Sequence, residues 1–292
     1  MGGLGNQMFQ YAFARALAER NHLPFKIDAT GLTEERQRGV TTPRKYALWC
    51  FNIQENLAND EEVNRLIGQK PESRLDRLLT RLHLAQANKA VAAHLREKGF
   101  EFFPEYLMPQ DGSYFEGYWQ TQKYFVDFER VIRQDFTLKK EFAVDERPIA
   151  KEIIANESVS LHIRRGDYVT SASTNKFHGT CSLEYYARGM EYVATSVGQP
   201  HYYVFSDDIA WVKDNLKFDH PVTFVSDGTL KDYEELTLMS YCKHNIIANS
   251  SFSWWGAWLN RNPEKIVIAP ERWFNEGQLN TKDLLPETWV RI

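Results

Sequence analysis

The stretch SVSLHIRRGDY, residues 158–168, decides the fold, because it joins an alternating strand pattern to a group of charged side chains. Further short strand patterns follow it, and each is separated from the next by a stretch with helical periodicity. They occupy residues 201–208, 222–227, 245–251 and 265–270. Short strands that alternate with helices in this way predict βαβ units and a parallel, doubly wound sheet.

Polar residues stand at the carboxyl ends of these predicted strands. They are Arg164, Arg165, Asp207, Asp208, Asn249 and Ser250. Ligands of doubly wound sheets bind outside the carboxyl ends of the strands. We therefore expect the binding site at this edge of the sheet.

The paired arginines have two interpretations. The alternation places His162 on the face opposite its apolar neighbours and lets Arg164 and Arg165 emerge at the strand end. Adjacent guanidinium groups can bind a diphosphate, because they bond bidentately to phosphate oxygens and stay charged. The alternative is a surface ion pair between Arg165 and Asp167, worth about 0–1 kcal/mol.

The stretch NSSFSWWGAW, residues 249–258, joins a strand pattern to an aromatic helix pattern. Its Asn and Ser residues are good helix N-caps, and N–H groups at the same helix start can also hold a phosphate. Trp254, Trp255 and Trp258 have helical spacing, which favours a place in the core. Asp207 and Asp208 in turn allow two interpretations, a metal-binding pair or a helix N-cap.

The glycine-rich stretch GGLGNQ, residues 2–7, precedes a helical stripe. It lacks the G-x-G-x-x-G register, which disfavours a nicotinamide cofactor, and the chain has no P-loop motif. Such a loop normally follows a strand in α/β proteins, and no strand pattern precedes it here. We therefore expect the first strand of the amino-terminal sheet to be missing.

Composition indicates an ordinary globular protein of 292 residues, 43% of them hydrophobic and 25% charged. The net charge of −4 disfavours a nucleic-acid partner. Cys50, Cys181 and Cys242 are odd in number and lack metal-site spacing, which favours a reducing compartment. No run approaches the roughly 20 apolar residues of a membrane span, and no signal-peptide pattern is present. We expect a cytoplasmic protein.

The first half of the chain is less regular. Strand patterns occupy residues 23–28 and 112–120, and residues 60–98 have helical patterns broken near Pro71. The charged stretch 138–152 is the candidate linker. This organisation predicts two α/β domains that face a cleft.

Five stretches between residues 2 and 270 are informative together: GGLGNQMFQYA, GYWQTQKYF, HIRRGDY, YYVFSDD and CKHNIIANSSFSWWGAWL. They resemble the bacterial α-1,2-fucosyltransferases, an inverting glycosyltransferase family that uses GDP-fucose. The resemblance implies a GT-B-like fold of two Rossmann-like domains, an acceptor-side domain over residues 1–145 and a GDP-fucose-binding domain over residues 146–292. It also implies a strand ahead of the glycine loop, and no metal or cofactor, with GDP-fucose as a co-substrate.

The resemblance implies roles for individual donor-binding residues. Arg164 is expected to bind the β-phosphate, with Arg165 supporting it or ordering the loop. His162 is expected to contact guanosine. Ser251 and Phe252 are expected to bind the diphosphate at the strand-to-helix turn.

Two further positions complete the expected site. Asn6, in the glycine loop, is expected to reach the bond being broken, so Asn6 and Arg164 are the expected catalytic residues. Guanine presents N1–H and N2–H donors and therefore needs a carboxylate. Glu235 is the choice by position, with Glu234 and Asp232 as alternatives. No residue is identified as the catalytic base.

The expected reaction transfers L-fucose from GDP-fucose to the 2-hydroxyl of a terminal galactoside, with inversion and without metal. The expected acceptor is a galactose-terminated oligosaccharide or a lipid-linked glycan, and peripheral association at the inner membrane is left open. Two alternatives remain, a protein O-fucosyltransferase-like enzyme and a non-catalytic sugar-binding protein. The second alternative leaves the paired arginines without a role.

Overall fold

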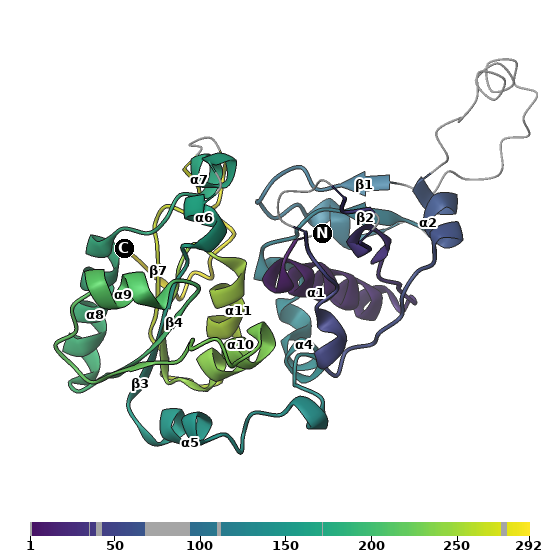
Figure 1. Cartoon of the computed structure of the whole chain (residues 1–292). Coiled ribbons are helices and arrows are strands. Elements are labelled where there is room, and N and C mark those ends of the chain that lie inside the picture. Colours follow the sequence, from purple (N-terminus) through teal and green to yellow (C-terminus); the bar gives the residue numbers. More distant parts are fainter. Residues whose placement is uncertain are drawn as a thin grey trace, which may run out of the picture.

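The computed structural model describes residues 2–34, 36–38, 43–67, 94–109, 112–170, 172–275 and 279–292. We call residues 2–145 the amino half and residues 146–292 the carboxyl half. Figure 1 shows the two halves side by side, with the chain passing from one to the other just ahead of helix α5. The predicted domain boundary lies in this connection and stays a prediction.

The carboxyl half is built on a six-stranded sheet in the order β5-β4-β3-β6-β7-β8. Its strands are β3 (Ser158–Ile163), β4 (His201–Ser206), β5 (Val222–Phe224), β6 (His244–Ile246), β7 (Val267–Ala269) and β8 (Val290–Arg291). All five neighbouring pairs are parallel. The parallel sheet predicted from the alternating strands and helices is therefore confirmed.

Helices cover both faces of this sheet. They are α5 (Pro148–Ala155), α6 (Gly166–Thr170), α7 (Ala172–His178), α8 (Leu183–Val197), α9 (Ile209–Asn215), α10 (Asp232–Tyr241) and α11 (Ser251–Leu259). On one face, Leu161 and Val204 pack against α8 and α9. On the other face, Tyr203 and Phe205 pack against α5 and α10. All six residues of β3 are consequently buried.

The strand order reverses direction beside β3. From β3 the chain adds β4 and β5 on one side, and then returns to place β6, β7 and β8 on the other. In doubly wound sheets, ligands bind at the crevice where the order reverses. Here that crevice lies between the carboxyl ends of β3 and β6, directly ahead of Arg164 and Asn249.

The amino half is organised around one long helix, α1 (Leu4–Asn21). The other helices among its described residues are α2 (Asp60–Ile67), α4 (Glu129–Asp135) and the short 3₁₀ turns η1 (Thr30–Leu32), η2 (Leu48–Cys50), η3 (Pro104–Leu107), η4 (Gln122–Tyr124), η5 (Val126–Phe128) and η6 (Lys140–Phe142). Strands β1 (His94–Arg96) and β2 (Tyr114–Glu116) form a parallel pair. A single parallel bridge joins Ile27 to Leu57.

Several expectations for the amino half need correction. The glycine stretch is not a loop over its whole length, because α1 begins at Leu4 and contains Asn6 in its first turn. Residues 94–96 form a strand rather than the end of a helix, since they pair with β2. The predicted helix break near Pro71 lies outside the described residues. Part of the candidate linker is helical, because η6 and α5 occupy residues 140–142 and 148–155.

An aromatic core joins the two halves. Trp254 and Trp255 on α11 are fully buried and lie 4.4 and 4.9 Å, centroid to centroid, from the Phe9 ring on α1. Phe125 from the amino half stacks on Trp255 at 5.4 Å. Trp258 is also buried, so the interpretation of these tryptophans as core residues is confirmed. Helix α11 therefore packs against the sheet of one half and against α1 of the other.

Candidate active site

The N-termini of α1 and α11 meet at the junction of the halves. The indole N–H of Trp255 donates to the carbonyl oxygen of Gly5 at 3.0 Å. A Cβ on Gly5 would lie 2.5 Å from the backbone carbon of Ser251, so only glycine permits this approach. Backbone N–H groups at helix N-termini carry partial positive charge, and two such ends here lie close together.

Asn6 and Ser251 are in direct contact across this junction, although 245 residues separate them. The side-chain oxygen of Asn6 accepts from the Ser251 hydroxyl at 2.7 Å and from the Gln120 amide at 2.8 Å. Two donors fix the orientation of the Asn6 amide, which leaves its NH₂ group as the donor it can offer elsewhere.

The residues of the sequence NSS have three different roles. Ser250 caps α11, because its hydroxyl oxygen accepts from the N–H of Phe252 at 3.3 Å. Asn249 holds the surrounding loops by donating to the carbonyl oxygens of His178, Gly179 and Trp273. Ser251 faces Asn6. The capping interpretation is thus correct for Ser250 alone.

The two arginines after β3 are held by the two aspartates after β4. Arg164 pairs with Asp207 at 2.9 Å. Arg165 donates its backbone N–H to Asp207 at 2.8 Å and its Nε to Asp208 at 3.3 Å, and its guanidinium carbon lies 3.6 Å from the Trp211 ring centroid. These contacts hold Arg165 in place, so it orders the loop after β3. Arg164 emerges at the crevice with a carboxylate beside it that an anionic ligand could replace.

Asp207 bonds to both arginines, and Asp208 bonds to Arg165. Asp208 caps α9 by accepting from the N–H of Trp211 at 3.2 Å, which confirms the capping interpretation. Arg165 pairs with Asp208. The side chain of Asp167, its other expected partner, lies outside the described part of the structure, so the Arg165–Asp167 pair stays a prediction. Within that described part, no cluster of three or more His, Cys, Asp or Glu side chains is placed to hold a metal ion.

His162 lies on the face of β3 opposite Leu161 and Ile163, as the alternation predicted, but helices cover that face as well. Its side chain is 4% exposed because α10 and α11 cover that face, and its ring lies 5.6 Å from Phe252. Its Nδ1 atom is buried and has no hydrogen-bond partner among the described residues. Burial, with the charge of Arg164 adding to it, lowers the pKa of His162 to about 3. The ring is therefore neutral, and its contact with guanosine stays a prediction.

The three acidic candidates on α10 are in different environments. Glu234 accepts from the backbone N–H of Lys231 and pairs with Arg147, so both its oxygens are in use. Asp232 is exposed. Glu235 is half-buried, and burial raises its pKa to about 7, with the charges of nearby aspartates adding to the shift. Glu235 is thus the carboxyl group that the fold leaves available near Asp207.

The predicted residues form one connected line in space. Asn6 bonds Ser251, and the neighbouring Phe252 ring lies beside His162. The charge of Arg164 helps to lower the pKa of His162, and Arg164 itself pairs with Asp207. Asp207 in turn influences the titration of Glu235. The line runs from the amino half to the carboxyl edge of the sheet.

Two residues of the amino half that position Asn6 were not predicted from any pattern in the sequence. Gln120 donates to Asn6, and the residue before it, Trp119, has a φ of +59°, which is rare for a bulky side chain. The Glu97 carboxylate accepts from the N–H groups of Tyr118 and Trp119 at 2.6 and 2.8 Å. These bonds hold the unfavourable backbone conformation that positions Gln120. The stretch GYWQTQKYF, which contains Trp119 and Gln120, was used in the sequence analysis only as part of the family resemblance.

A parallel sheet with an arginine at its switch point and two helix N-termini beside it is typical of enzymes that bind nucleotide phosphates. The profile described as Glycosyl transferase family 11 matches residues 1–292. The chain belongs to glycosyl transferase family 11.

Three relatives with a stated activity or role are similar to this chain. The chain is 35% identical to "Alpha-1,2-colitosyltransferase" of Escherichia coli, over all of this chain and 96% of that protein. It is 32% identical to "O-antigen biosynthesis glycosyltransferase WbnK" of Escherichia coli, over all of this chain and 98% of that protein. It is 23% identical to "Galactoside alpha-(1,2)-fucosyltransferase 2" of Gorilla gorilla gorilla, over 89% of this chain and 67% of that protein. Among the described residues no helix has the length and apolar character needed to cross a membrane.

Proposed function

We propose that the protein transfers L-fucose from GDP-fucose to the 2-hydroxyl of a terminal galactoside, with inversion and without a metal ion or cofactor. The observation that carries this proposal is the position of Arg164 at the switch point, next to the paired N-termini of α1 and α11. Relatives named as α-1,2 transferases and as galactoside fucosyltransferases support the linkage and the substrate class.

The proposed donor site consists of the neighbouring residues from Ser251 to Arg164 and Glu235. The diphosphate binds Arg164 and the N–H groups at the start of α11, beside Ser251 and Phe252, and displaces Asp207 from the guanidinium group. Arg165 keeps the loop in place through Asp208 and Trp211. Glu235 accepts the N1–H and N2–H of guanine, for which it must be ionised. His162 packs against Phe252 as a neutral ring and contacts guanosine.

The reaction is a single displacement at the anomeric carbon. The acceptor oxygen attacks C1 of fucose from the face opposite the phosphate, and the C1–O bond to the β-phosphate breaks with its electron pair leaving on GDP. The proton of the acceptor hydroxyl passes to a base or to the departing phosphate. Arg164 stabilises the charge that develops on the phosphate, which is the role that Mg²⁺ has in other transferases. Asn6 offers its NH₂ group near the breaking bond.

The proposal assigns the two halves different substrates. In a GT-B-like arrangement the carboxyl half binds the nucleotide sugar and the amino half presents the acceptor, a galactose-terminated oligosaccharide or lipid-linked glycan. The contact between Asn6 and Ser251 is where the two halves would act together.

A direct assay tests the proposal. GDP release from GDP-fucose is measured with and without lactose, and the linkage and anomeric configuration of the product are determined. We expect acceptor-dependent GDP release and an α-1,2 linkage. Release that does not depend on any galactoside, or binding without release, would contradict it.

A second donor is favoured by one observation, the 35% identity to a relative named as a colitosyltransferase. Colitose is L-fucose without its 3-hydroxyl group, so the same phosphate and guanine contacts can serve both donors. Comparing kcat/KM for GDP-fucose and GDP-colitose with one acceptor decides between them.

A further inference from the structure

Trp49 is a large aromatic side chain that stays exposed where the two halves meet. It lies in η2 between Leu48 and Cys50, which are both buried in the aromatic core. Trp49 itself is nevertheless 41% exposed, more than any other tryptophan in the chain. A backbone that is anchored on both sides therefore presents an indole to the solvent.

Two aromatic rings hold this indole in place. Phe142 of η6 and Tyr233 of α10 lie 4.9 and 5.6 Å from the Trp49 ring, centroid to centroid. Both rings stand nearly perpendicular to the indole, at 88° and 77°, and among the described residues no aromatic ring stacks parallel to it. The ammonium group of Lys139 also donates to the carbonyl oxygen of Trp49 at 2.6 Å. The indole is thus fixed in orientation without being covered.

The segment that carries Trp49 is bonded to the residue that follows Asn6. The Gln7 side chain accepts from the N–H of Ala47 at 2.9 Å and donates to the carbonyl oxygen of Lys45 at 2.8 Å. Gln7 is itself buried on α1. Because Trp49 follows Ala47 by two residues, the indole belongs to the segment that borders the turn of α1 carrying Asn6.

The neighbour of the indole in the carboxyl half belongs to the helix that carries Glu235. Tyr233 precedes Glu235 by two residues in the first turn of α10. Figure 1 shows α10 on the side of the carboxyl half that faces the amino half. Trp49 therefore lies between a segment bound to α1 and a helix of the proposed donor site.

The surroundings of the indole suit a sugar better than a lipid or an apolar peptide. Asp232 and Lys140, which are close in the chain to Tyr233 and Phe142, are exposed. A lipid or an apolar peptide needs a contiguous apolar patch, which charged side chains interrupt. A pyranose ring has C–H groups on one face and hydroxyl groups along its edge. The C–H face can bury apolar surface on an indole, and the hydroxyl groups can bond to polar side chains around it.

We propose that the indole of Trp49 is the platform on which the second sugar of the acceptor stacks, the sugar to which the terminal galactose is linked. This inference rests on the proposed function, since it assigns the acceptor to the same site. The terminal galactose has to place its 2-hydroxyl near Asn6, so the second sugar lies further out. Trp49, two residues beyond the bond to Gln7, is at such an outer position. The platform therefore favours disaccharide acceptors over single galactosides.

The kinetic test compares lactose with methyl β-galactoside, which lacks the second sugar. We expect kcat/KM of the unaltered chain to be at least tenfold higher for lactose, because truncating an aromatic anchor commonly costs tenfold or more in affinity. Trp49→Ala should lose this preference while its kcat/KM for methyl β-galactoside and its KM for GDP-fucose change less than twofold. Trp49→Phe keeps a smaller ring and should retain part of the preference.

A matched control and two outcomes keep the test sharp. Tyr192→Ala removes an aromatic side chain that is 44% exposed on α8, and it should leave both acceptors unaffected. An equal loss on both acceptors in Trp49→Ala would show that the indole only joins the halves, which overturns the proposal. An unchanged preference for lactose in Trp49→Ala overturns it as well.

A binding measurement separates this inference from the proposed function. The indole N–H signal of Trp49 in a ¹H–¹⁵N spectrum is identified by its absence in Trp49→Phe. With GDP present, we expect lactose to shift this signal and methyl β-galactoside to leave it nearly unchanged. A shift without any fucose transfer would contradict the proposed function and leave the platform standing. Fucose transfer without a shift would overturn the platform and leave the proposed function standing.

Discussion

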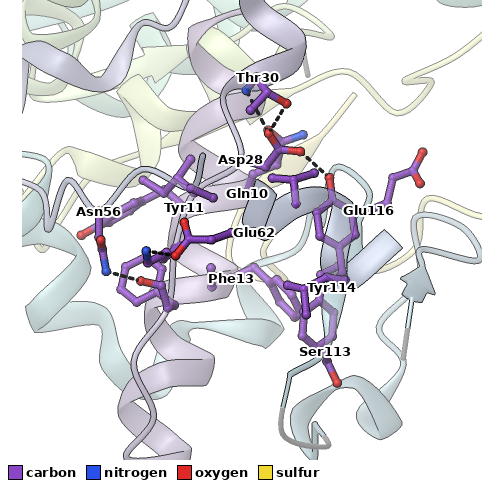
Figure 2. A pocket seen from close by; sticks show the side chains of 18 of the residues that line it. Gln10, Tyr11, Phe13, Asp28, Thr30, Asn56, Glu62, Ser113, Tyr114 and Glu116 are labelled. Atoms are coloured by element: carbon purple, nitrogen blue, oxygen red, sulfur yellow. Dashed lines mark hydrogen bonds and ion pairs between the residues drawn. The ribbon is translucent and has the colours of Figure 1, made fainter. Parts of the chain in front are cut away.

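β3 in the carboxyl half and β2 in the amino half are both parallel strands, yet their surroundings differ. β3 pairs with β4 on one side and β6 on the other, and each of its residues is buried. Among the described residues β2 pairs with β1 alone, and all three of its residues line a cavity beside α1 (Figure 2). The difference teaches that the carboxyl half has a sheet with a fully buried central strand, whereas the described strands of the amino half form a two-stranded pair.

The same contrast extends to the site. In the proposed site the carboxyl half supplies the charged groups, with Arg164 directly after β3 and Glu235 on α10. The amino half supplies Asn6 and Gln120, which are positioned by a backbone strained at Trp119. We therefore expect substitutions in the two halves to affect different kinetic steps.

The largest effect is expected from Arg164→Ala. Removing a preorganised donor that stabilises transition-state charge costs about 10²–10³ in rate, so transfer should fall by at least two orders of magnitude. Arg164→Lys should recover little, because a point charge cannot replace the bidentate guanidinium. Arg130→Ala, an exposed arginine on α4 of the amino half, is the matched control and should retain full activity. Near-normal transfer by Arg164→Ala would remove this residue from the site.

A smaller effect is expected in the amino half from Glu97→Ala. Without this carboxylate the N–H groups of Tyr118 and Trp119 lose their acceptor, and Gln120 no longer holds Asn6 in place. A displacement of about 1 Å at a reacting centre can cost around 10²-fold, so kcat should fall about tenfold to a hundredfold. The KM for GDP-fucose should change little, since the donor contacts that we propose lie in the carboxyl half.

Two comparisons test this positioning role. Glu97→Gln keeps one carbonyl acceptor and should recover part of kcat. Glu105→Gln replaces an exposed carboxylate paired with Lys98 and should be neutral. An equal loss of kcat and donor affinity in Glu97→Ala would show that the halves do not divide the work in this way.

A tenfold effect is expected from pH through Glu235. Its pKa is raised to about 7 in the folded protein, and guanine needs the ionised form. GDP affinity should therefore rise about tenfold between pH 6 and pH 8, because the fraction ionised increases by that factor. Calorimetric titration measures this, together with release of a proton on binding at pH 6. Glu235→Gln should bind weakly with a flat pH profile, and a flat profile in the unaltered chain would exclude Glu235.

The same carboxyl group affects stability with a defined sign. Its folded pKa lies above the ordinary value of 4.5, so the folded state binds more protons between about pH 4.5 and pH 7. The contribution of Glu235 to the free energy of unfolding is complete below this window and is lost as the pH rises through it. Denaturant unfolding of the unaltered chain and Glu235→Gln across this range should diverge accordingly.

The smallest effect is expected from metal removal. If Arg164 and the start of α11 carry the phosphate charge, activity should be unchanged in a large excess of EDTA. Loss of activity on chelation, with recovery on adding Mg²⁺ or Mn²⁺, would return Asp207 and Asp208 to consideration as metal ligands.

The sequence alone determined the features that depend on near neighbours. Alternation and helical spacing predicted the parallel sheet of the carboxyl half, and strand ends predicted where Arg164 emerges. Capping preference predicted a serine at the start of α11, and helical spacing predicted the buried tryptophans. Each of these depends on residues a few positions apart, whose periodicity is visible in the chain itself.

Only the tertiary structure decided the features that depend on distant segments and on exclusion of water. The contact of Asn6 with Ser251 joins residues 245 positions apart, and no local pattern encodes it. Burial of His162 follows from the helices packed over β3, and the choice of Glu235 over Glu234 follows from a cap and an ion pair at Glu234 alone. A short strand gains stability only from its neighbours across the sheet, so the amino half, whose described strands are three residues long, was the part that sequence patterns predicted least well.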